Sequence, residues 1–113
     1  MIRPKSVSLN RYTYRITWSE DDNEYIGLCA EFPSLSWLSQ NPGSALKGIM
    51  SVVEDVCDDM TKNGEFLPQP LSTKSYSGRF VVRIPPESHR ALTIKAAEEG
   101  ISLNRLISDK LSR

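Results

Sequence analysis

The chain has 113 residues and a formal net charge of zero, with 39% hydrophobic and 25% charged residues. This length suits one ordinary domain or two very small ones, and the composition is typical of globular rather than disordered proteins. No apolar run is long enough to span a membrane, and residues 1–10 lack the apolar core of a secretory signal, so we expect a cytoplasmic protein.

The sequence contains two cysteines, Cys29 and Cys57, and one histidine, His89. Without a secretory signal, the two cysteines are expected to be reduced core residues rather than a disulfide. A structural metal site needs about four ligands, more than these distant residues provide. We therefore expect no metal and no cofactor.

The zero net charge conceals a division along the chain. Residues 1–70 hold six Lys/Arg and ten Asp/Glu, whereas residues 71–113 hold eight Lys/Arg and four Asp/Glu. A basic C-terminal part suits an anionic partner, and an acidic N-terminal part suits a basic one. The alternative is that short segments differ by a few charges without functional meaning.

Three strands and a helix are predicted in the N-terminal part. Apolar and polar residues alternate over 12–18, which predicts a strand. After a polar turn, bulky apolar residues indicate a second strand over 24–30, and a third strand is expected over 34–39. From Ala45 the apolar residues recur every three or four positions, which predicts an amphipathic helix. The N-terminal part therefore reads as βββα, and the chain belongs to the α+β class.

Several single residues carry specific expectations in this N-terminal part. Asn41 or Ser44 is expected to cap the helix, and Gly64 to end it. Gly27 inside the second strand suggests either a bulge or a close neighbour. Trp18 and Trp37 are expected in the core rather than at a contact surface, because a small domain needs their buried area.

A linker is predicted between the two parts of the chain. The stretch 65–77 is rich in proline and serine and has no periodicity. We place the N-terminal domain at 1–70, the linker at 71–77 and the C-terminal domain at 78–113.

The C-terminal part is predicted to be a strand followed by two helices. Residues 79–84 alternate, with Phe80, Val82 and Ile84 on one side and two arginines on the other, and Pro85 ends the strand. Pro86 suits the first turn of a helix, which Gly100 ends, and Ser102 is expected to cap the next helix.

One such strand with two short helices is too small to bury its own apolar face. Two copies bury it if their strands pair antiparallel and the four helices close over the apolar side. The other side of this two-stranded ribbon then presents four arginines, two from each copy, and such a ribbon fits the DNA major groove. The sequence therefore predicts a homodimer, and a tetramer if the N-terminal sheets also pair.

Two stretches resemble known families. Residues 78–112, from Gly-Arg-Phe-Val-Val-Arg-Ile-Pro-Pro-Glu to Glu-Glu-Gly-Ile-Ser-Leu-Asn-Arg-Leu-Ile, resemble the ribbon-helix-helix repressors of the Arc and MetJ type. The N-terminal part, above all Gly-Leu-Cys-Ala-Glu-Phe-Pro-Ser-Leu-Ser, resembles the HicB antitoxins of bacterial type II toxin–antitoxin systems. This resemblance implies a partial RNase H-like domain followed by a ribbon-helix-helix domain.

The resemblance also implies a function and a set of DNA contacts. The N-terminal domain would bind and block a HicA-like toxin that cleaves mRNA, and the C-terminal dimer would bind the operator DNA of its own operon and repress it. By matching positions, Arg79, Val81 and Arg83 would read bases, although valine replaces the polar residue of the Arc pattern. The start of the last helix would clamp a phosphate through backbone N–H groups, at Ser102, Leu103 and Asn104.

The acidic side chains are candidate contacts for a basic toxin. They lie in the predicted turn after the first strand and on the polar face of the long helix, and are Asp21, Asp22, Glu54, Asp55, Asp58 and Asp59. The alternative is an ordinary solvated surface. Similarly, Arg79 and Arg83 have a non-functional alternative, because charges on an exposed strand discourage aggregation.

We predict no catalytic activity. The predicted strands offer no cluster of carboxylates for a two-metal site, and His89, the only histidine, has no nucleophile beside it in the sequence pattern. Two rival functions stay open. One is a plain ribbon-helix-helix repressor whose N-terminal domain senses a ligand or oligomerises, and the other is an inhibitor whose C-terminal dimer only assembles the particle.

Overall fold

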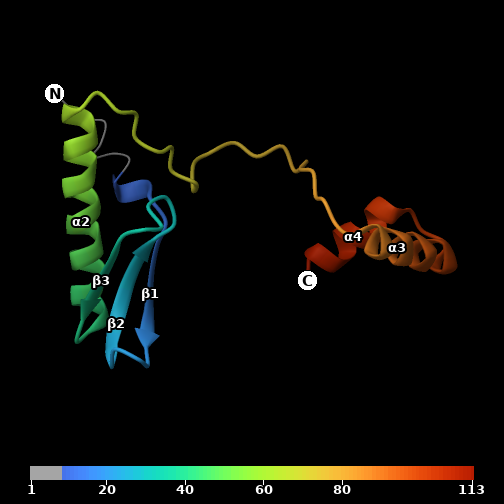
Figure 1. Cartoon of the computed structure of the whole chain (residues 1–113), viewed down its shortest axis with the longest axis horizontal. Coiled ribbons are helices and arrows are strands. Elements are labelled where there is room, and N and C mark those ends of the chain that lie inside the picture. The colour runs from blue at the N-terminus through green and yellow to red at the C-terminus, as the bar shows by residue number, and fades with distance from the viewer. Residues whose placement is uncertain (1–8) are drawn as a thin grey trace. The chain divides into compact units, whose positions relative to one another are not determined.

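The computed structural model describes residues 9–113, which form two compact units (Figure 1). The first unit ends at Tyr76 and the second comprises Ser77–Arg113, so the division lies somewhat after the boundary predicted near residue 70. The elements are β1 (Tyr14–Ser19), β2 (Glu24–Cys29), β3 (Ser36–Ser39), α2 (Pro42–Lys62), α3 (Pro86–Glu99) and α4 (Leu103–Leu111). The predicted α+β class is confirmed: an antiparallel sheet is followed by helices.

The first unit is a three-stranded antiparallel sheet in the order β1-β2-β3. The register between β1 and β2 runs without interruption from Tyr14 opposite Cys29 to Ser19 opposite Glu24. The three predicted strands are therefore present, with ends that differ from 12–18, 24–30 and 34–39 by at most two residues. Asn23 closes the β1–β2 turn with a φ of 52°, a left-handed conformation that asparagine tolerates.

Helix α2 covers one face of this sheet (Figure 1). Its buried side chains recur every four residues, so they form one stripe along the helix: Ala45, Ile49, Val53 and Cys57. Of the two predicted caps, Asn41 is the one used, since its side chain accepts the backbone N–H of Ser44 at 2.8 Å. After the helix, Gly64 adopts a φ of 73°, as expected for a helix end.

Two glycines allow α2 to approach the sheet closely. A Cβ atom on Gly27 would lie 2.6 Å from the carbonyl oxygen of Ala45, and one on Gly48 would lie 2.0 Å from Cδ1 of Trp37. Gly27 therefore marks a close neighbour and not a bulge. Trp37 packs over the helix yet stays 44% exposed, and Trp18 is 45% exposed, so the prediction that both tryptophans belong to the core is wrong.

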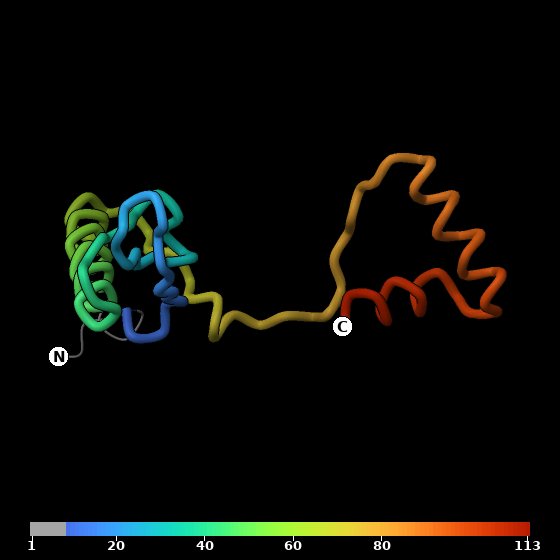
Figure 2. Tube along the Cα trace, turned by 90° about the horizontal axis from the view of Figure 1, so that it is seen from below, coloured from blue at the N-terminus to red at the C-terminus, as the bar shows by residue number. Residues whose placement is uncertain are grey.

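The segment after α2 returns to the first unit and is held there (Figure 2). We call residues 65–72 the strap. The hydroxyl of Tyr12 donates to the carbonyl of Pro68 at 2.8 Å, and the backbone N–H of Leu71 donates to the carboxylate of Glu31 at 2.8 Å. The hydroxyl of Ser72 donates to the carbonyl of Arg11. The first two residues of the predicted linker, Leu71 and Ser72, are therefore hydrogen-bonded to the first unit.

The second unit contains the two short helices. Helix α3 begins at Pro86 and is ended by Gly100, whose φ is 69°. Helix α4 is capped by Ser102, whose hydroxyl accepts the backbone N–H of Arg105 at 3.0 Å. Ala96 and Leu106 are the two side chains of this unit that are buried, with exposures of 3% and 4%. A single copy therefore has almost no core here.

The strand predicted over Arg79–Ile84 is not formed in the single chain. These residues are extended but belong to no sheet, because a strand needs a hydrogen-bonded neighbour and the part of this copy that the structure describes provides none. Their apolar side chains stay open to solvent: Phe80 is 72% and Val82 is 62% exposed.

Candidate functional site

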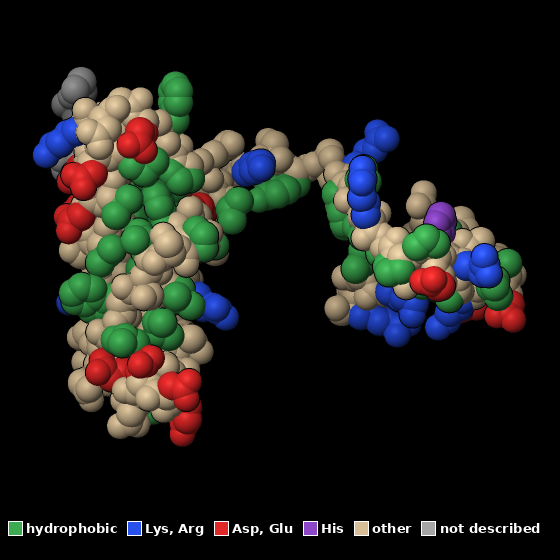
Figure 3. All heavy atoms as spheres, viewed as in Figure 1, with side chains coloured by type: hydrophobic (Ala, Val, Ile, Leu, Met, Phe, Trp, Pro, Cys, Tyr) green, Lys and Arg blue, Asp and Glu red, His purple; other side chains and the backbone are tan. Residues whose placement is uncertain are grey.

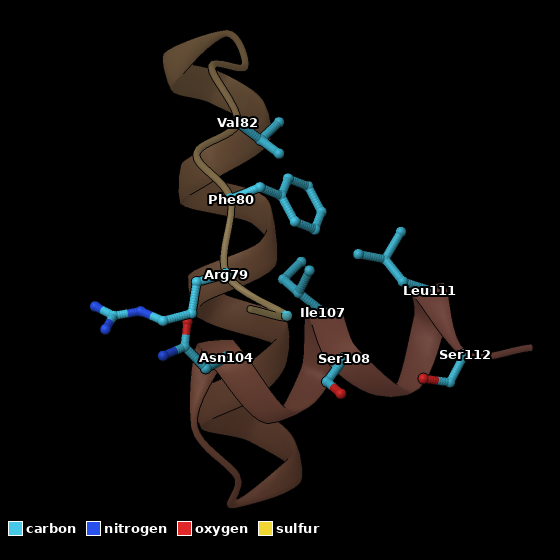
Figure 4. Close-up of a pocket in the computed structure, with 9 residues that line it drawn as sticks. Arg79, Phe80, Val82, Asn104, Ile107, Ser108, Leu111 and Ser112 are labelled. Carbon is cyan, nitrogen blue, oxygen red and sulfur yellow. The ribbon is translucent and has the colours of Figure 1, made fainter. Parts of the chain in front are cut away.

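A groove lies between the extended segment and α4 in the second unit, with a volume of about 610 Å³. Its lining is Gly78, Arg79, Phe80, Val82, Asn104, Ile107, Ser108, Leu111 and Ser112. Figure 4 shows Phe80 and Val82 on the side of the segment that faces Ile107 and Leu111. The groove is therefore apolar along one wall, and nothing in this copy fills it.

Arg79 points away from these apolar side chains and lies beside Asn104 (Figure 4). Val81, the next residue on the same side of an extended chain, is 92% exposed, and Arg83 follows it, also exposed. The three predicted base-reading residues thus alternate with the apolar ones as the sequence pattern indicated. Both sides of the segment are accessible, and each has a different chemical character.

The N-terminus of α4 gathers the three residues predicted to clamp a phosphate. Ser102 is its cap, and the hydroxyl of Ser102 is already used by the N–H of Arg105. The N–H groups of Leu103 and Asn104 lie in the first turn, where no carbonyl of the helix precedes them. These two donors suit an anion because the helix dipole is positive at this end. The serine side chain at position 102 is therefore explained by its role as the helix cap, and it is not needed to bind an anion.

Sequence reasoning missed several basic residues of the second unit. Arg105 is exposed on the first turn of α4, close in sequence to the two free donors. Lys110 lies among like charges: Lys95 first, and Arg113 as well, hold the pKa of its ammonium below the usual range. The surplus of Lys and Arg in this part was the signal, and Figure 3 shows basic side chains at several places on the surface of the second unit.

The six acidic candidates do not form one site. Asp21 and Asp22 lie exposed in the β1–β2 turn, and Asp22 accepts the hydroxyl of Ser19 at 2.8 Å. The other group begins at Glu54 in the middle of α2, about 18 Å along the helix from Pro42. Its members Glu54, Asp55 and Asp59 are exposed and Asp58 is half-buried. Acidic side chains accordingly appear at both ends of the first unit (Figure 3).

Residues 9–113 contain no group of three or more His, Cys, Asp or Glu side chains that is placed to hold a metal ion. Cys29 and Cys57 are both buried, reduced cysteines, as predicted. Burial is the main cause that raises the pKa of the Cys29 thiol to about 11. This thiol is therefore protonated near neutral pH and is a poor nucleophile. Among the described helices, none is long and apolar enough to cross a membrane.

Residues 63–111 match the model of the HicB family. This match covers the end of the first unit, the strap and the second unit, which together are less than half of the chain. It supports HicB family membership and a role related to toxin–antitoxin systems. The matched range includes all six predicted DNA contacts, from Arg79 to Asn104, and excludes the sheet. No curated protein and no solved structure matches the chain.

Proposed function

We propose that this protein is a HicB-type antitoxin that joins two activities in one chain. The first unit, a partial RNase H-like domain, binds and blocks a small basic HicA-like toxin that cleaves mRNA. The second unit dimerises as a ribbon-helix-helix domain and binds the operator of its own operon. The chain itself has no catalytic activity and needs no cofactor, and it acts in the cytoplasm, where its mRNA-cleaving partner and the operator are found.

The two-sided extended segment carries this proposal. Phe80 and Val82 line an open apolar groove, while Arg79 points to the opposite side (Figure 4). Burying a large apolar side chain stabilises by about 1.5–3 kcal/mol, so a unit as small as Ser77–Arg113 loses much of its available stabilisation if several such side chains stay exposed. A second copy would supply both a strand to pair with residues 79–84 and the side chains that fill the groove.

The charged side of such a dimer suits DNA. Pairing of the two segments places Arg79, Val81 and Arg83 of both copies on one surface, where arginine reaches guanine O6 and N7 and Val81 contacts a thymine methyl. The free N–H groups of Leu103 and Asn104 lie in the same unit and suit a backbone phosphate. Arg105 adds a side chain for the same backbone. The family match over 63–111 supports this reading.

The toxin-binding role rests on the family match and on charge. The exposed carboxylates of α2 and of the β1–β2 turn give a basic protein two separate acidic surfaces, around Glu54 and around Asp21. These surfaces are separate, so a small toxin would contact only one of them. We assign the contact to α2, which carries four carboxylates, and take the turn, which carries two, as the second choice. The α2 group is Glu54, Asp55, Asp58 and Asp59, and the turn residues are Asp21 and Asp22.

Native copurification tests the toxin half of the proposal. The tagged chain is purified from its host without denaturant, and intact mass spectrometry identifies what accompanies it. A small basic protein in near-stoichiometric amount, which arrests growth when expressed alone, is the expected result. Reversing the charge of Glu54 and Asp55 to lysine should release it, whereas reversal of Asp21 and Asp22 is the matched comparison.

A plain ribbon-helix-helix repressor is the second candidate function. It is favoured by the position of the family match, which covers the second unit and leaves the sheet out. In this alternative the first unit senses a ligand or oligomerises. Copurification of operator DNA without any accompanying protein would favour this alternative. Salt-independent or undetectable DNA binding would exclude operator binding by the second unit, and with it this part of both candidate functions.

A further inference from the structure

The side chain of Phe66, in the strap, stands out from the surface of the first unit. It is 96% exposed, whereas Trp18, another large hydrophobic side chain of this unit, is 45% exposed. The next residue, Leu67, is half-buried and packs against the core of the first unit. An aromatic ring is thus left in water although its neighbour in the chain is held against the protein.

The turn that ends α2 fixes where Phe66 lies. The backbone N–H of Gly64 donates to the carbonyl of Thr61 at 3.2 Å, and that of Glu65 donates to the carbonyl of Met60 at 2.8 Å. This pair of bonds around a glycine of positive φ is the Schellman motif, which ends a helix and sets the direction of the chain that follows. The Cα atom of Phe66 therefore lies no more than about 8 Å from the carbonyl oxygen of Met60, beside the last turn of α2.

The rest of the strap is held in place before any partner binds. The carbonyl of Pro68 accepts the hydroxyl of Tyr12 at 2.8 Å, and Pro70 is buried. The backbone N–H of Leu71 donates to a carboxylate of the first unit at 2.8 Å. The two prolines also fix φ at their own positions. A partner that grips Phe66 does not have to order this segment, and ordering is one of the main costs of binding.

The surface beside Phe66 is acidic. Residues 54–66 carry five carboxylates and a single lysine, Lys62. The carboxylates belong to Glu54, Asp55, Asp58, Asp59 and Glu65. This charge repels nucleic acid and also repels the same surface of a second copy, whereas it attracts a basic protein.

Exposed ion pairs alone contribute little to affinity, so an acidic surface needs an apolar anchor to hold a partner tightly. We propose that Phe66 is the anchor by which this protein holds its small basic partner. The ring enters an apolar recess of the partner, and basic side chains around that recess face the carboxylates at the end of α2. The inference rests on the toxin-binding role proposed above and adds to it the residue that carries a large share of the binding energy.

The range of the family match agrees with a role for the strap. Within the first unit the match covers residues 63–76, which include the whole strap and leave out the sheet. The strap is therefore the part of the first unit in which this chain resembles the HicB family most directly. This favours a shared role for the segment that presents Phe66.

The rate at which the partner leaves the complex tests this inference. The tagged chain is purified from its own host with the small basic protein that accompanies it, once as the parent and once as Phe66→Ala. An excess of untagged parent chain is then added, and intact mass spectrometry follows the loss of the small protein from the tagged chain. The loss should be at least about tenfold faster from Phe66→Ala, since truncations at an interface act mainly on dissociation.

Two further variants serve as controls. Tyr76→Ala removes another aromatic side chain, 68% exposed, together with its hydrogen bond to the carbonyl of Leu71 at the far end of the strap, and should leave the rate unchanged. Phe66→Leu keeps apolar bulk and should give an intermediate rate. Urea unfolding of Phe66→Ala should match the parent, because so exposed a side chain contributes little to stability. A marked loss of stability, or an equal effect of Tyr76→Ala on the rate, would overturn the inference.

The same samples separate this inference from the function on which it rests. If no small basic protein accompanies the parent chain, the proposed toxin binding fails and this inference fails with it. If the partner leaves Phe66→Ala no faster than it leaves the parent, the toxin-binding role stands and this inference alone is wrong. If light scattering gives a lower mass for the partner-free Phe66→Ala chain than for the parent, Phe66 joins copies of the chain and the inference is also wrong.

Discussion

The carboxylate of Glu31 accepts the backbone N–H of Leu71, 40 residues further along the chain, at 2.8 Å. The same carboxylate accepts the backbone N–H of Thr13 at 2.9 Å and its hydroxyl at 3.1 Å. One side chain thus joins the start of the sheet, the β2–β3 loop and the strap. Glu31 therefore holds the strap against the sheet.

We expect Glu31→Ala to release the strap. The variant loses four hydrogen bonds at a partly exposed position, one of them a weak bond from the Cys29 thiol, which should lower the free energy of unfolding by about 1–2 kcal/mol. Limited proteolysis should then cut after Phe66 or Leu71 faster than in the parent chain. Glu31→Gln keeps one acceptor oxygen and should give an intermediate rate. Equal cleavage of all three proteins would refute the role of Glu31.

Acid should release the strap in the same way. Burial acts to raise the pKa of Glu31, but the N–H groups of Leu71 and Thr13 outweigh it and hold the pKa below its ordinary value of 4.5. A group with a lowered pKa stabilises the fold fully above the ordinary value, and that stability is lost as the pH falls through the lowered pKa. Hydrogen exchange at Leu71, measured from pH 6 downwards, should show lost protection in acid, and Glu31→Gln should remove this pH dependence.

Gly48→Ala should destabilise the first unit, although alanine is the better helix former. The new Cβ would lie 2.0 Å from Trp37, so the indole must move off α2. Overpacking of this kind costs about 1–3 kcal/mol, more than the roughly 1 kcal/mol gained in helix propensity. Gly43→Ala in the same helix is the control, since its nearest neighbour would be 3.5 Å away. Urea unfolding followed by tryptophan fluorescence measures both, and a more stable Gly48→Ala protein would contradict the packing.

Phe80→Ala should weaken dimerisation, whereas Val81→Ala should not. Phe80 lies on the groove side of the extended segment, and Val81 lies on the opposite side with 92% exposure. Truncating a phenylalanine that becomes buried in the dimer costs about 3–5 kcal/mol, which is enough to shift a dimer to monomer at micromolar concentration. Light scattering over a dilution series gives the answer. Equal masses for the two variants would show that the groove is not the dimer interface.

Arg83→Ala and Arg105→Ala should weaken DNA binding in different ways. Loss of a bidentate base contact by Arg83 should cost about 1–3 kcal/mol on the operator and little on unrelated DNA. Loss of a phosphate contact by Arg105 should weaken both alike and should reduce the salt dependence of binding by about one counterion. Titrations at several salt concentrations measure both effects. An Arg83→Ala protein with unchanged operator affinity would exclude that arginine from base reading.

Local chemistry made most elements readable from the sequence. Alternation predicted the first strand and bulky apolar residues the next two, and the recurrence of Ile49, Val53 and Cys57 predicted α2. The helix ends followed from capping: Asn41 and Ser102 accept backbone N–H groups, and Gly64 and Gly100 take positive φ. These signals depend only on residues a few positions apart, so they can be read without any knowledge of the tertiary contacts.

What the sequence did not reveal depends on contacts between distant residues. The strap looks like a linker because its proline and serine content hides the hydrogen bonds of Pro68 and Leu71 to the first unit. Trp37 looks like a core residue because it is large and hydrophobic. Its sequence position does not reveal that the indole packs against Gly48 of α2 while the rest of the ring stays exposed. The predicted strand at 79–84 depends on a neighbouring strand, and residues 9–113 of one copy offer none beside it.

The unpaired extended segment would also determine how the proposed repression depends on the concentration of this protein. In the proposed dimer each chain supplies only half of the ribbon, so while chains are scarce the quantity of complete ribbon would grow with the square of their number. Halving the supply of chains would then remove three quarters of the repressing species. Control of the operon would respond steeply to dilution, long before the chains themselves were exhausted.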